Sequence, residues 1–545
     1  MTSDRISPVL RRYCLYLVLV SGLLASSFPY LYGLAVRPAG TLYWAVPMIN
    51  YSDANQYLAL TRQAVDGRVL VADPFTQRPH APRLFLPEVL AEAAVCRIFG
   101  VSPLVSFQVS RVISGSLLLL ASYWLGTLFL ARFRQRALFV GLLCFSAGTS
   151  WYLELLRIPW INGDLYQPEG NTFHTLANLP HLSLSSALLT ALFASLAAWE
   201  MRCDRTAAQA PKGVNWLLPF AFACAFLLAW THPFDLVTYT LGVGVYCGIR
   251  LLRDRELPGS ALRHVGTVFL GAAPAALYLG WLVRSDPVYR ALANDVSVVQ
   301  DLRFYLLAHG LLLVPALTLL FGADSRRRFL LPLCWVGCAF LFLLTPFRMG
   351  GKQPRLLGGV HAPLALLAAA GLDRAARRAA LGRSKSTQTS LAWGIGAGFL
   401  MISSTGVLGM IQRQTKGYAV RGPGFYLSPA VQDLFRYLDQ YGDRSQLTLG
   451  GAHTGEWAPV LADTRVFHGH WHMTLNEPQK RAERDWFFKT NADPLRKSSW
   501  LRENGINWVV CFPWEWGNSL VSPDTVPGLR RVYSTPEIWL YRFED

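Results

Sequence analysis

Residues 13–34 read YCLYLVLVSGLLASSFPYLYGL, an apolar run without Lys, Arg, Asp or Glu. A helix needs about 20 such residues to cross the hydrocarbon core of a bilayer. Similar runs recur along the chain, and we predict about eleven membrane-spanning helices. The predicted spans lie near residues 13–34, 107–131, 137–156, 181–200, 214–232, 234–252, 265–283, 304–323, 329–346, 357–372 and 390–411. The expected fold is therefore an α-helical polytopic membrane protein.

Composition agrees with lipid as the main solvent. Of the 545 residues, 52% are hydrophobic and 16% are charged, whereas a soluble protein carries about 25% charged residues. This excludes a disordered chain and an ordinary soluble enzyme. The net charge of +17 is concentrated in loops, so it indicates membrane topology, and we expect no nucleic-acid partner. The nine cysteines show no CxxC or Cys/His metal spacing, which gives no sign of a disulfide framework or a zinc site.

The distribution of Lys and Arg predicts the orientation. One set of alternate loops holds 21 basic residues, and the short loops of the opposite side hold six. Cytoplasmic loops carry the excess of Lys and Arg, so we expect a multi-pass protein of the inner or plasma membrane with its N-terminus in the cytoplasm. An odd number of spans places the C-terminus outside.

Two long segments then fall on the outer side. The first is the loop 35–106, which belongs to a transmembrane domain over residues 1–411. The second is the tail 412–545, in which helical and strand patterns alternate, as expected for a small extracytoplasmic α/β domain. We predict helices over 428–441, 477–489 and 494–503, strands over 446–449 and 507–511, and a final strand pair over 531–534 and 538–543.

The loop 35–106 contains two short amphipathic helical patterns, near residues 53–67 and 86–100. Such helices, tethered between spans, are expected to lie flat at the membrane interface. Asp53 stands at the start of the first pattern. It can be an N-cap that forms a capping box with Gln56, or a carboxylate at the membrane surface that acts as a general base on a hydroxyl. The two roles are compatible, because a capping Asp can keep one oxygen free.

This layout resembles the GT-C class of integral-membrane glycosyltransferases, which includes protein mannosyltransferases, aminoarabinose transferases and bacterial polyprenyl-phosphate-sugar-dependent transferases. The resemblance covers residues 10–410. The matching stretches are Asp53-x-x-x-Tyr57, Asp73-Pro74-Phe75-Thr76, His232-Pro233-Phe234-Asp235, Phe347-Arg348, and Gly359 through Leu364.

The resemblance implies that the donor is a sugar on a polyprenyl phosphate or diphosphate, and that Asp53 is the catalytic base of an inverting transfer. It also makes Tyr57 a candidate substrate contact. In the metal-dependent branch of the class the second outer loop carries a paired acidic motif. Here residues 162–169 read NGDLYQPE, without D-x-D, so we expect no required metal or other cofactor.

Three cations lie in a later outer loop, Arg348, Lys352 and Arg355, with glycines beside them. Glycine lets the backbone approach an anion, and Arg or Lys stabilises the charge on a departing lipid phosphate. These three are our candidates for binding the donor phosphate. The alternative is contact with lipid headgroups at the end of a span.

Other ionisable residues are weaker candidates for substrate binding. His232 and Asp235 lie where two spans meet, and ionisable groups at membrane depth are functional candidates; the alternative is a turn in which Asp235 caps the next helix. The second outer loop offers further candidates: Asp164, Glu169, His174 and His181. The alternative is that these residues are simply the polar side chains of a solvated loop.

In the tail, His468, His470 and His472 alternate. On a strand they would share one face and could bind a metal, whereas a plain polar strand or turn is the alternative reading.

We therefore expect a membrane glycosyltransferase that moves a sugar from a polyprenyl-phosphate donor to an acceptor glycan, lipid or protein on the outer face. The alternatives are a polymerase or ligase of lipid-linked glycans, and a transporter or flippase of a lipid-linked saccharide. We see neither an internal repeat nor charges deep in several spans, which transporters often show.

Overall fold

The computed structural model describes residues 7–159, 163–203, 216–256, 258–294, 301–344 and 353–544. The chain forms two compact units. The first, called here the helical unit, comprises Met1–Pro29, Val109–Leu279 and Val296–Thr415. The second, called here the mixed unit, comprises Tyr30–Gln108, Gly280–Asp295 and Lys416–Asp545, so the first loop and the tail belong to the same unit.

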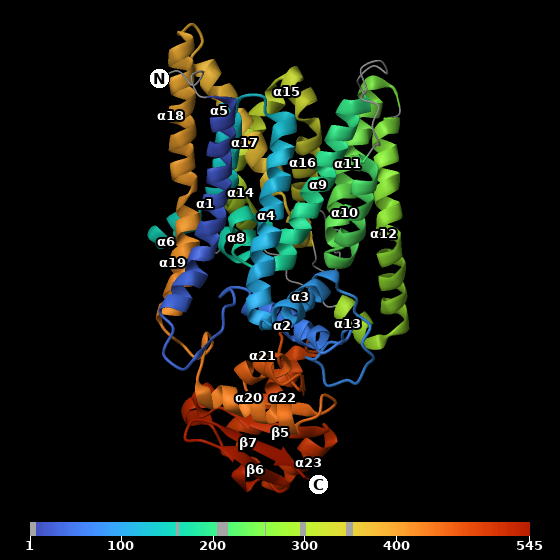
Figure 1. Cartoon of the computed structure of the whole chain (residues 1–545), viewed down its shortest axis with the longest axis vertical. Helices are drawn as coiled ribbons and strands as arrows, with labels where there is room; N and C mark the ends of the chain where they lie inside the picture. Colours follow the sequence, from blue (N-terminus) through green and yellow to red (C-terminus); the bar gives the residue numbers. More distant parts are fainter. Residues whose placement is uncertain are drawn as a thin grey trace. The chain divides into compact units, whose positions relative to one another are not determined.

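The helical unit is a bundle of long helices that run roughly along one direction (Figure 1). Its main helices, some of which continue into the mixed unit, are α1 (Pro8–Ala35), α4 (Pro103–Phe129), α5 (Phe133–Phe145), α9 (Pro180–Cys203), α10 (Leu217–Thr231), α11 (Phe234–Asp254), α12 (Gly259–Ser285), α14 (Leu302–Leu317), α16 (Leu330–Leu344), α17 (His361–Ala379), α18 (Lys385–Ser403) and α19 (Thr405–Ala419). Short helices link them: α6 (Ser150–Leu155), α7 (Gly163–Tyr166), η2 (Pro168–Gly170), α8 (Thr172–Leu176), η3 (Thr318–Phe321), α15 (Ala323–Arg328) and η4 (Gln353–Leu357).

Each of the eleven predicted spans contains a helix, but not all of these helices are long enough to span a membrane. In the described part of the chain, seven helical segments have sufficient length and hydropathy, and Leu217–Thr231 and Leu330–Leu343 are shorter apolar helices. The fold class is therefore confirmed as a polytopic helical membrane protein, and seven of the predicted spans satisfy the length requirement outright.

The predicted span 137–156 is not one helix. Helix α5 ends at Phe145, the chain is extended at Ser146, and α6 begins at Ser150. Neighbouring helices provide the lost backbone partners, because Ala147 N donates to Ser403 O and Thr149 N donates to Leu307 O. Irregular backbone at membrane depth is tolerated where protein groups satisfy it in this way.

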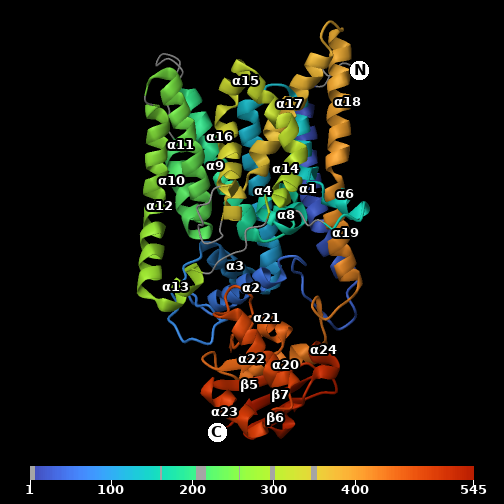
Figure 2. The same ribbon diagram turned by 180° about the vertical axis from the view of Figure 1, so that it is seen from behind.

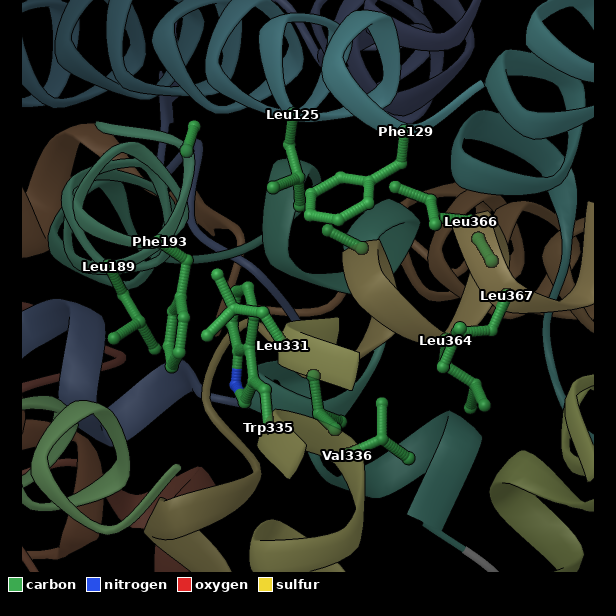
Figure 3. Close-up of a cluster of buried hydrophobic side chains, with 14 of the residues drawn as sticks. Leu125, Phe129, Leu189, Phe193, Leu331, Trp335, Val336, Leu364, Leu366 and Leu367 are labelled. Atoms are coloured by element: carbon green, nitrogen blue, oxygen red, sulfur yellow. The ribbon is translucent and has the colours of Figure 1, made fainter. Parts of the chain in front are cut away.

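The predicted span 357–372 corresponds to α17, which is an interior helix. Every residue from His361 to Asp373 is buried. Its leucines, Leu364, Leu366 and Leu367, belong to the large apolar core that also holds Phe193 of α9 and Trp335 of α16 (Figure 3). The Phe193 and Trp335 rings stack with centroids 4.0 Å apart and planes 9° apart. Dense packing around α17 holds the bundle together.

The mixed unit contains a five-stranded sheet in the order β4-β3-β5-β7-β6. The strands are β3 (Leu447–Leu449), β4 (Arg465–Val466), β5 (Ile506–Cys511), β6 (Leu529–Ser534) and β7 (Trp539–Phe543). Strand β3 pairs in parallel with β4 and β5, and β7 pairs antiparallel with β5 and β6. The helices of the tail are α20 (Pro429–Tyr441), α21 (Ala452–Leu461), α22 (Glu477–Lys489), α23 (Pro494–Glu503) and α24 (Pro513–Trp516). The predicted α/β architecture of the tail is thus confirmed.

The rest of the mixed unit comes from two segments. The first loop supplies α2 (Tyr51–Val65) and α3 (Pro87–Phe99), and residues 280–295 supply α13 (Pro287–Asn294). Helices α2 and α3 share a small apolar core around Leu60 and Val89. A short antiparallel pair joins the loop to the tail, β1 (Leu42–Tyr43) with β2 (Tyr426–Leu427). The chain thereby folds the first loop and the tail together, and helices α2 and α21 pack against each other (Figure 2).

Candidate functional site

Asp53 lies in the first turn of α2, but it is not the cap of that helix. The N-cap is Asn50, whose side chain makes no capping hydrogen bond. The helix begins at Tyr51 because two contacts from α21 fix its first turn. The Trp457 indole Nε1 donates to Tyr51 Oη at 2.6 Å, and Ser52 Oγ donates to Glu456 Oε1. The predicted capping box at Asp53 is therefore wrong, and the Asp53 carboxylate is available for other contacts.

One Asp53 oxygen is held by a histidine of the tail. His470 Nε2 lies 2.9 Å from Asp53 Oδ1. The other ring nitrogen, Nδ1, accepts backbone N–H bonds from His472 and Met473, both at 3.1 Å. A nitrogen that accepts two N–H groups carries no proton, so the hydrogen of the neutral ring is on Nε2. His470 therefore donates to Asp53, and its tautomer is fixed by the turn around it.

The loop that carries His470 is a tight turn and not a strand. Thr474 N donates to His470 O at 3.0 Å, and Gly469 N donates to Thr474 Oγ1 at 3.1 Å. A side chain at Gly455 of α21 would clash with the backbone of this loop, so the loop lies directly on that helix. Of the readings of the histidine run, the turn is therefore confirmed, and the strand with three histidines on one face is wrong. His468 instead contacts Glu477, with Nε2 and Oε1 3.1 Å apart.

The two members of the Asp53–His470 pair differ in exposure. The side chain of His470 is 1% exposed and that of Asp53 is 31% exposed. Among the described residues, no hydrogen bond reaches the second Asp53 oxygen, Oδ2. A carboxylate that is fixed through one oxygen and open at the other has the geometry needed to accept a proton from a bound hydroxyl.

A second carboxyl group, Glu456 of α21, lies in the same cluster. Burial raises the pKa of Glu456, while the nearby His470 and a hydrogen bond from Ser52 act in the opposite direction. Asp53 is close enough for its charge to raise this pKa further. Glu456 is thus a buried carboxyl group with a raised pKa beside the partly exposed Asp53 side chain.

Asp73, in the stretch that resembles the family's first loop, is also buried near His470. Burial raises the pKa of Asp73 to about 7, and a hydrogen bond from Phe75 N acts in the opposite direction. The Phe75 ring packs on His470, with centroids 5.7 Å apart. This packing contributes to the burial of the imidazole, whose side chain is 1% exposed.

A separate polar cluster lies in the helical unit, at the junction of α10 and α11. His232 Nδ1 lies 3.1 Å from Asp235 Oδ1, and Asp235 is fully buried. The Arg355 guanidinium, from η4, lies over the Phe234 ring at 5.2 Å from its centroid. The charges of Arg355 and Glu169 both act on His232, and those of His232 and Arg355 act on His181. The structure thus brings together five residues that the sequence singled out.

Close backbone packing holds this cluster in place. A Cβ at Gly358 would lie 2.5 Å from Asp235 Oδ1, so only glycine fits beside the carboxylate. Thr238 Oγ1 donates to Leu356 O at 3.2 Å, and Gln167 Nε2 donates to Pro354 O at 2.7 Å. The segment that carries Arg355 is therefore tied both to α11 and to the second predicted loop.

Other predicted candidates lie elsewhere. Asp164 is buried and accepts hydrogen bonds from the Ser150 backbone and hydroxyl, which is a structural role. His174 is buried in α8, where its backbone N–H bonds the capping Asn171. Tyr57 packs against the α2–α3 core. Arg348 and Lys352 lie outside the described residues.

Sequence reasoning missed Glu456 and Ser52 and gave His470 no specific role. The local sequence around Glu456 and Trp457 does not show that α21 packs on α2. Within the described residues, no group of three or more His, Cys, Asp or Glu side chains is arranged to hold a metal ion.

Comparison with solved structures identifies the fold. One similar structure is AglB, an archaeal oligosaccharyltransferase from Archaeoglobus fulgidus in complex with an inhibitory peptide and a dolichol-phosphate. It is 12% identical to this chain, and the match covers 92% of this chain and 69% of that chain with a TM-score of 0.53. ArnT from Cupriavidus metallidurans, bound to undecaprenyl phosphate, is 13% identical and matches over 96% and 97% of the two chains, with a TM-score of 0.53.

The mycobacterial arabinofuranosyltransferase AftD is 15% identical, with a TM-score of 0.56 over 98% of this chain and 40% of that chain. No family model and no curated protein sequence matches the chain. At these identities the likeness concerns the fold. The chain therefore has the fold of the integral-membrane glycosyltransferases of the GT-C class.

Proposed function

We propose that this protein is a membrane glycosyltransferase that moves a sugar from a polyprenyl-phosphate carrier to an acceptor hydroxyl on the non-cytoplasmic face. The observation that carries the proposal is the Asp53 carboxylate, held by His470 through one oxygen and partly exposed at the other. The fold supports it, because the structures that share it include ArnT bound to undecaprenyl phosphate and AglB with a dolichol-phosphate.

In the proposed reaction Asp53 is the general base. Its Oδ2 takes the proton from the acceptor hydroxyl as the oxygen attacks the anomeric carbon of the donor sugar. The bond between that carbon and the phosphate oxygen breaks, and its electron pair leaves with the lipid phosphate. One displacement inverts the anomeric configuration. A positioned general base contributes about 10²- to 10⁴-fold to such a step.

His470 acts in this proposal as a positioning residue. It orients the Asp53 carboxylate and stabilises its negative charge before the acceptor binds. Its own orientation is fixed by backbone groups of the turn 470–474. The role of the tail is thus to complete the site of the base.

Arg355 is proposed to bind the donor phosphate, together with Arg348 and Lys352. A guanidinium binds phosphate oxygens in a fixed fork and stabilises the charge that develops on the leaving group. The support is its placement in a buried polar cluster, with its segment tied to α11 and to Gln167.

The test uses the purified full chain in nanodiscs, incubated with a panel of undecaprenyl-phosphate and undecaprenyl-diphosphate sugars and an envelope extract as acceptor source. Mass spectrometry of the lipid fraction measures the product. A transferase of the proposed type releases undecaprenyl phosphate and forms a new glycoside, with and without EDTA. Release of the diphosphate indicates the polymerase or ligase alternative. Movement of donor across the bilayer without any new glycosidic bond indicates a flippase.

A further inference from the structure

A groove on the helical unit, lined by none of the candidate site residues, has the shape and charge of a lipid site. It lies along the seam between α11 and α16, with η3 and α15 at one end, and encloses about 950 Å³. Helix α11 contributes Val245, Ile249 and Arg253 to its wall, at a spacing of four residues. Helix α16 contributes a second stripe, made of Leu330, Leu333, Cys334, Gly337, Cys338 and Leu341. The two helices pack together and lie side by side (Figure 2).

The length of the groove matches one leaflet of a bilayer. The α16 stripe runs from Leu330 to Leu341, which at a rise of about 1.5 Å per residue is about 16 Å. The hydrocarbon core is about 30 Å thick, so one leaflet contributes about half of that. Both walls are apolar, and Leu341 of α16 and Val245 of α11 are 58% and 44% exposed. A side chain at Gly337 would meet nothing within 4 Å, so this glycine keeps the middle of the groove open.

Charge gathers at one end of the groove only. Arg253 is neutralised by Asp254, with Nε and Oδ1 2.7 Å apart. Arg326 and Arg327, from α15, are exposed and line the same end. In the described part of the chain neither of these two arginines forms an ion pair, and one carboxylate, Asp324, accompanies them. This end therefore has a surplus of positive charge next to an apolar wall. It is also the side on which the basic loops lie, expected to be cytoplasmic.

We propose that this groove binds a glycerophospholipid with an anionic headgroup, taken from the leaflet on the basic side. One acyl chain lies against the stripe between Leu330 and Leu341, and the phosphate accepts hydrogen bonds from Arg326 and Arg327. Basic pockets between spanning helices on the cytoplasmic side select anionic headgroups in this manner. A zwitterionic headgroup binds with less favourable free energy, because the same arginines repel its positively charged group. The site is independent of the proposed transferase chemistry.

The probe is native mass spectrometry of the full chain exchanged into equal mixtures of phosphatidylglycerol and phosphatidylethanolamine with identical acyl chains. Each arginine near a charged membrane surface favours an anionic lipid by about fivefold. We expect the wild type to retain phosphatidylglycerol, and R326Q/R327Q to retain it about 10- to 30-fold less. The matched control is R378Q/R383Q, which removes two exposed arginines of the same side that do not line the groove. It is expected to behave as the wild type.

A second variant tests the apolar wall. Gly337→Leu fills the groove without breaking α16, because leucine favours helix over glycine. It is expected to abolish retention of both lipids while the protein stays monodisperse. The proposal is overturned if the wild type retains both lipids equally, or if the arginine and control variants lose phosphatidylglycerol alike. It is also overturned if G337L retains both lipids as the wild type does, or if the retained lipid is undecaprenyl phosphate. A dimer that G337L dissociates would overturn it too, because a second copy of the chain would then occupy the groove.

Discussion

Substitution of His470 is the sharpest perturbation of the proposed site. His470→Ala removes the hydrogen bond that holds Asp53 Oδ1. Hydrogen bonds to charged groups contribute about 1.5–3 kcal/mol, and about 1.4 kcal/mol corresponds to tenfold in rate. The Asp53 side chain is 31% exposed, so water can partly replace the lost hydrogen bond. The lower end of this free-energy range therefore applies. We expect the turnover number to fall by about 10- to 30-fold.

The pattern of the effect separates positioning from folding. His470→Gln keeps a side-chain N–H that can reach Asp53, although it loses the acceptor for the two backbone N–H groups of the turn. Its rate is therefore expected between those of the wild type and the alanine variant. The fall should be in kcat, with the KM for the lipid donor unchanged, because His470 contacts the base and not the donor in this proposal.

The assay is the release of undecaprenyl phosphate by the purified full chain, with a thermal unfolding curve for each variant. His472→Gln is the control, since it belongs to the same turn and keeps the backbone N–H that His470 accepts. If His470→Ala turns over at the wild-type rate while its fold is intact, His470 does not position Asp53. If the glutamine and alanine variants lose activity and stability in parallel, the role of His470 is structural.

Three further variants test the surroundings. Arg355→Ala is expected to raise the KM for the polyprenyl-phosphate donor and to lower kcat about 10- to 100-fold. Arg355→Lys should recover part of this loss, because lysine keeps the charge but not the forked guanidinium geometry. Equal kinetics of the wild type and both variants would show that Arg355 does not bind the donor. Gly358→Ala would place a methyl group 2.5 Å from Asp235 Oδ1, so the buried carboxylate or the backbone must shift, at a cost of about 1–3 kcal/mol. An unchanged melting temperature would contradict the packing described for this segment. Burial raises the pKa of Glu515 from 4.5 to about 7, so the folded mixed unit keeps this proton while the unfolded chain releases it. The contribution of Glu515 to stability is then complete below pH 4.5 and falls by up to about 3 kcal/mol as the pH rises to 7. Glu515→Gln should reduce the slope of stability against pH in tryptophan-fluorescence unfolding curves, and an equal slope in both proteins would show that Glu515 does not contribute.

Local patterns were sufficient for much of the fold. Each predicted span contains a helix, and the tail shows the predicted helices 477–489 and 494–503 within those same bounds. These features follow from hydropathy and periodicity over neighbouring residues. The span 137–156 was mistaken because its break depends on partners from α14 and α18, such as Leu307 O and Ser403 O, which no local pattern records.

The site required information from distant parts of the chain. Asp53 stood out because a polar turn precedes a helical pattern. Its role as a cap was wrong because Trp457 and Glu456 contact Tyr51 and Ser52 and start the helix two residues earlier. The contact between His470 and Asp53 joins residues 417 positions apart. In the histidine run, alternation suggested a strand, whereas Gly469 and Thr474 close a turn that aims one imidazole at the carboxylate.

The identity of the base is tested most directly by Asp53→Asn. Asparagine keeps the size of the side chain and a possible contact with His470, but it cannot take a proton. In one experiment, native mass spectrometry measures the bound polyprenyl-phosphate sugar and a single-turnover assay measures its transfer. We predict that the variant binds the donor as the wild type does and transfers it at least 100-fold more slowly, in line with the contribution of a general base. Transfer at the wild-type rate by a folded, donor-loaded Asp53→Asn protein would contradict the account.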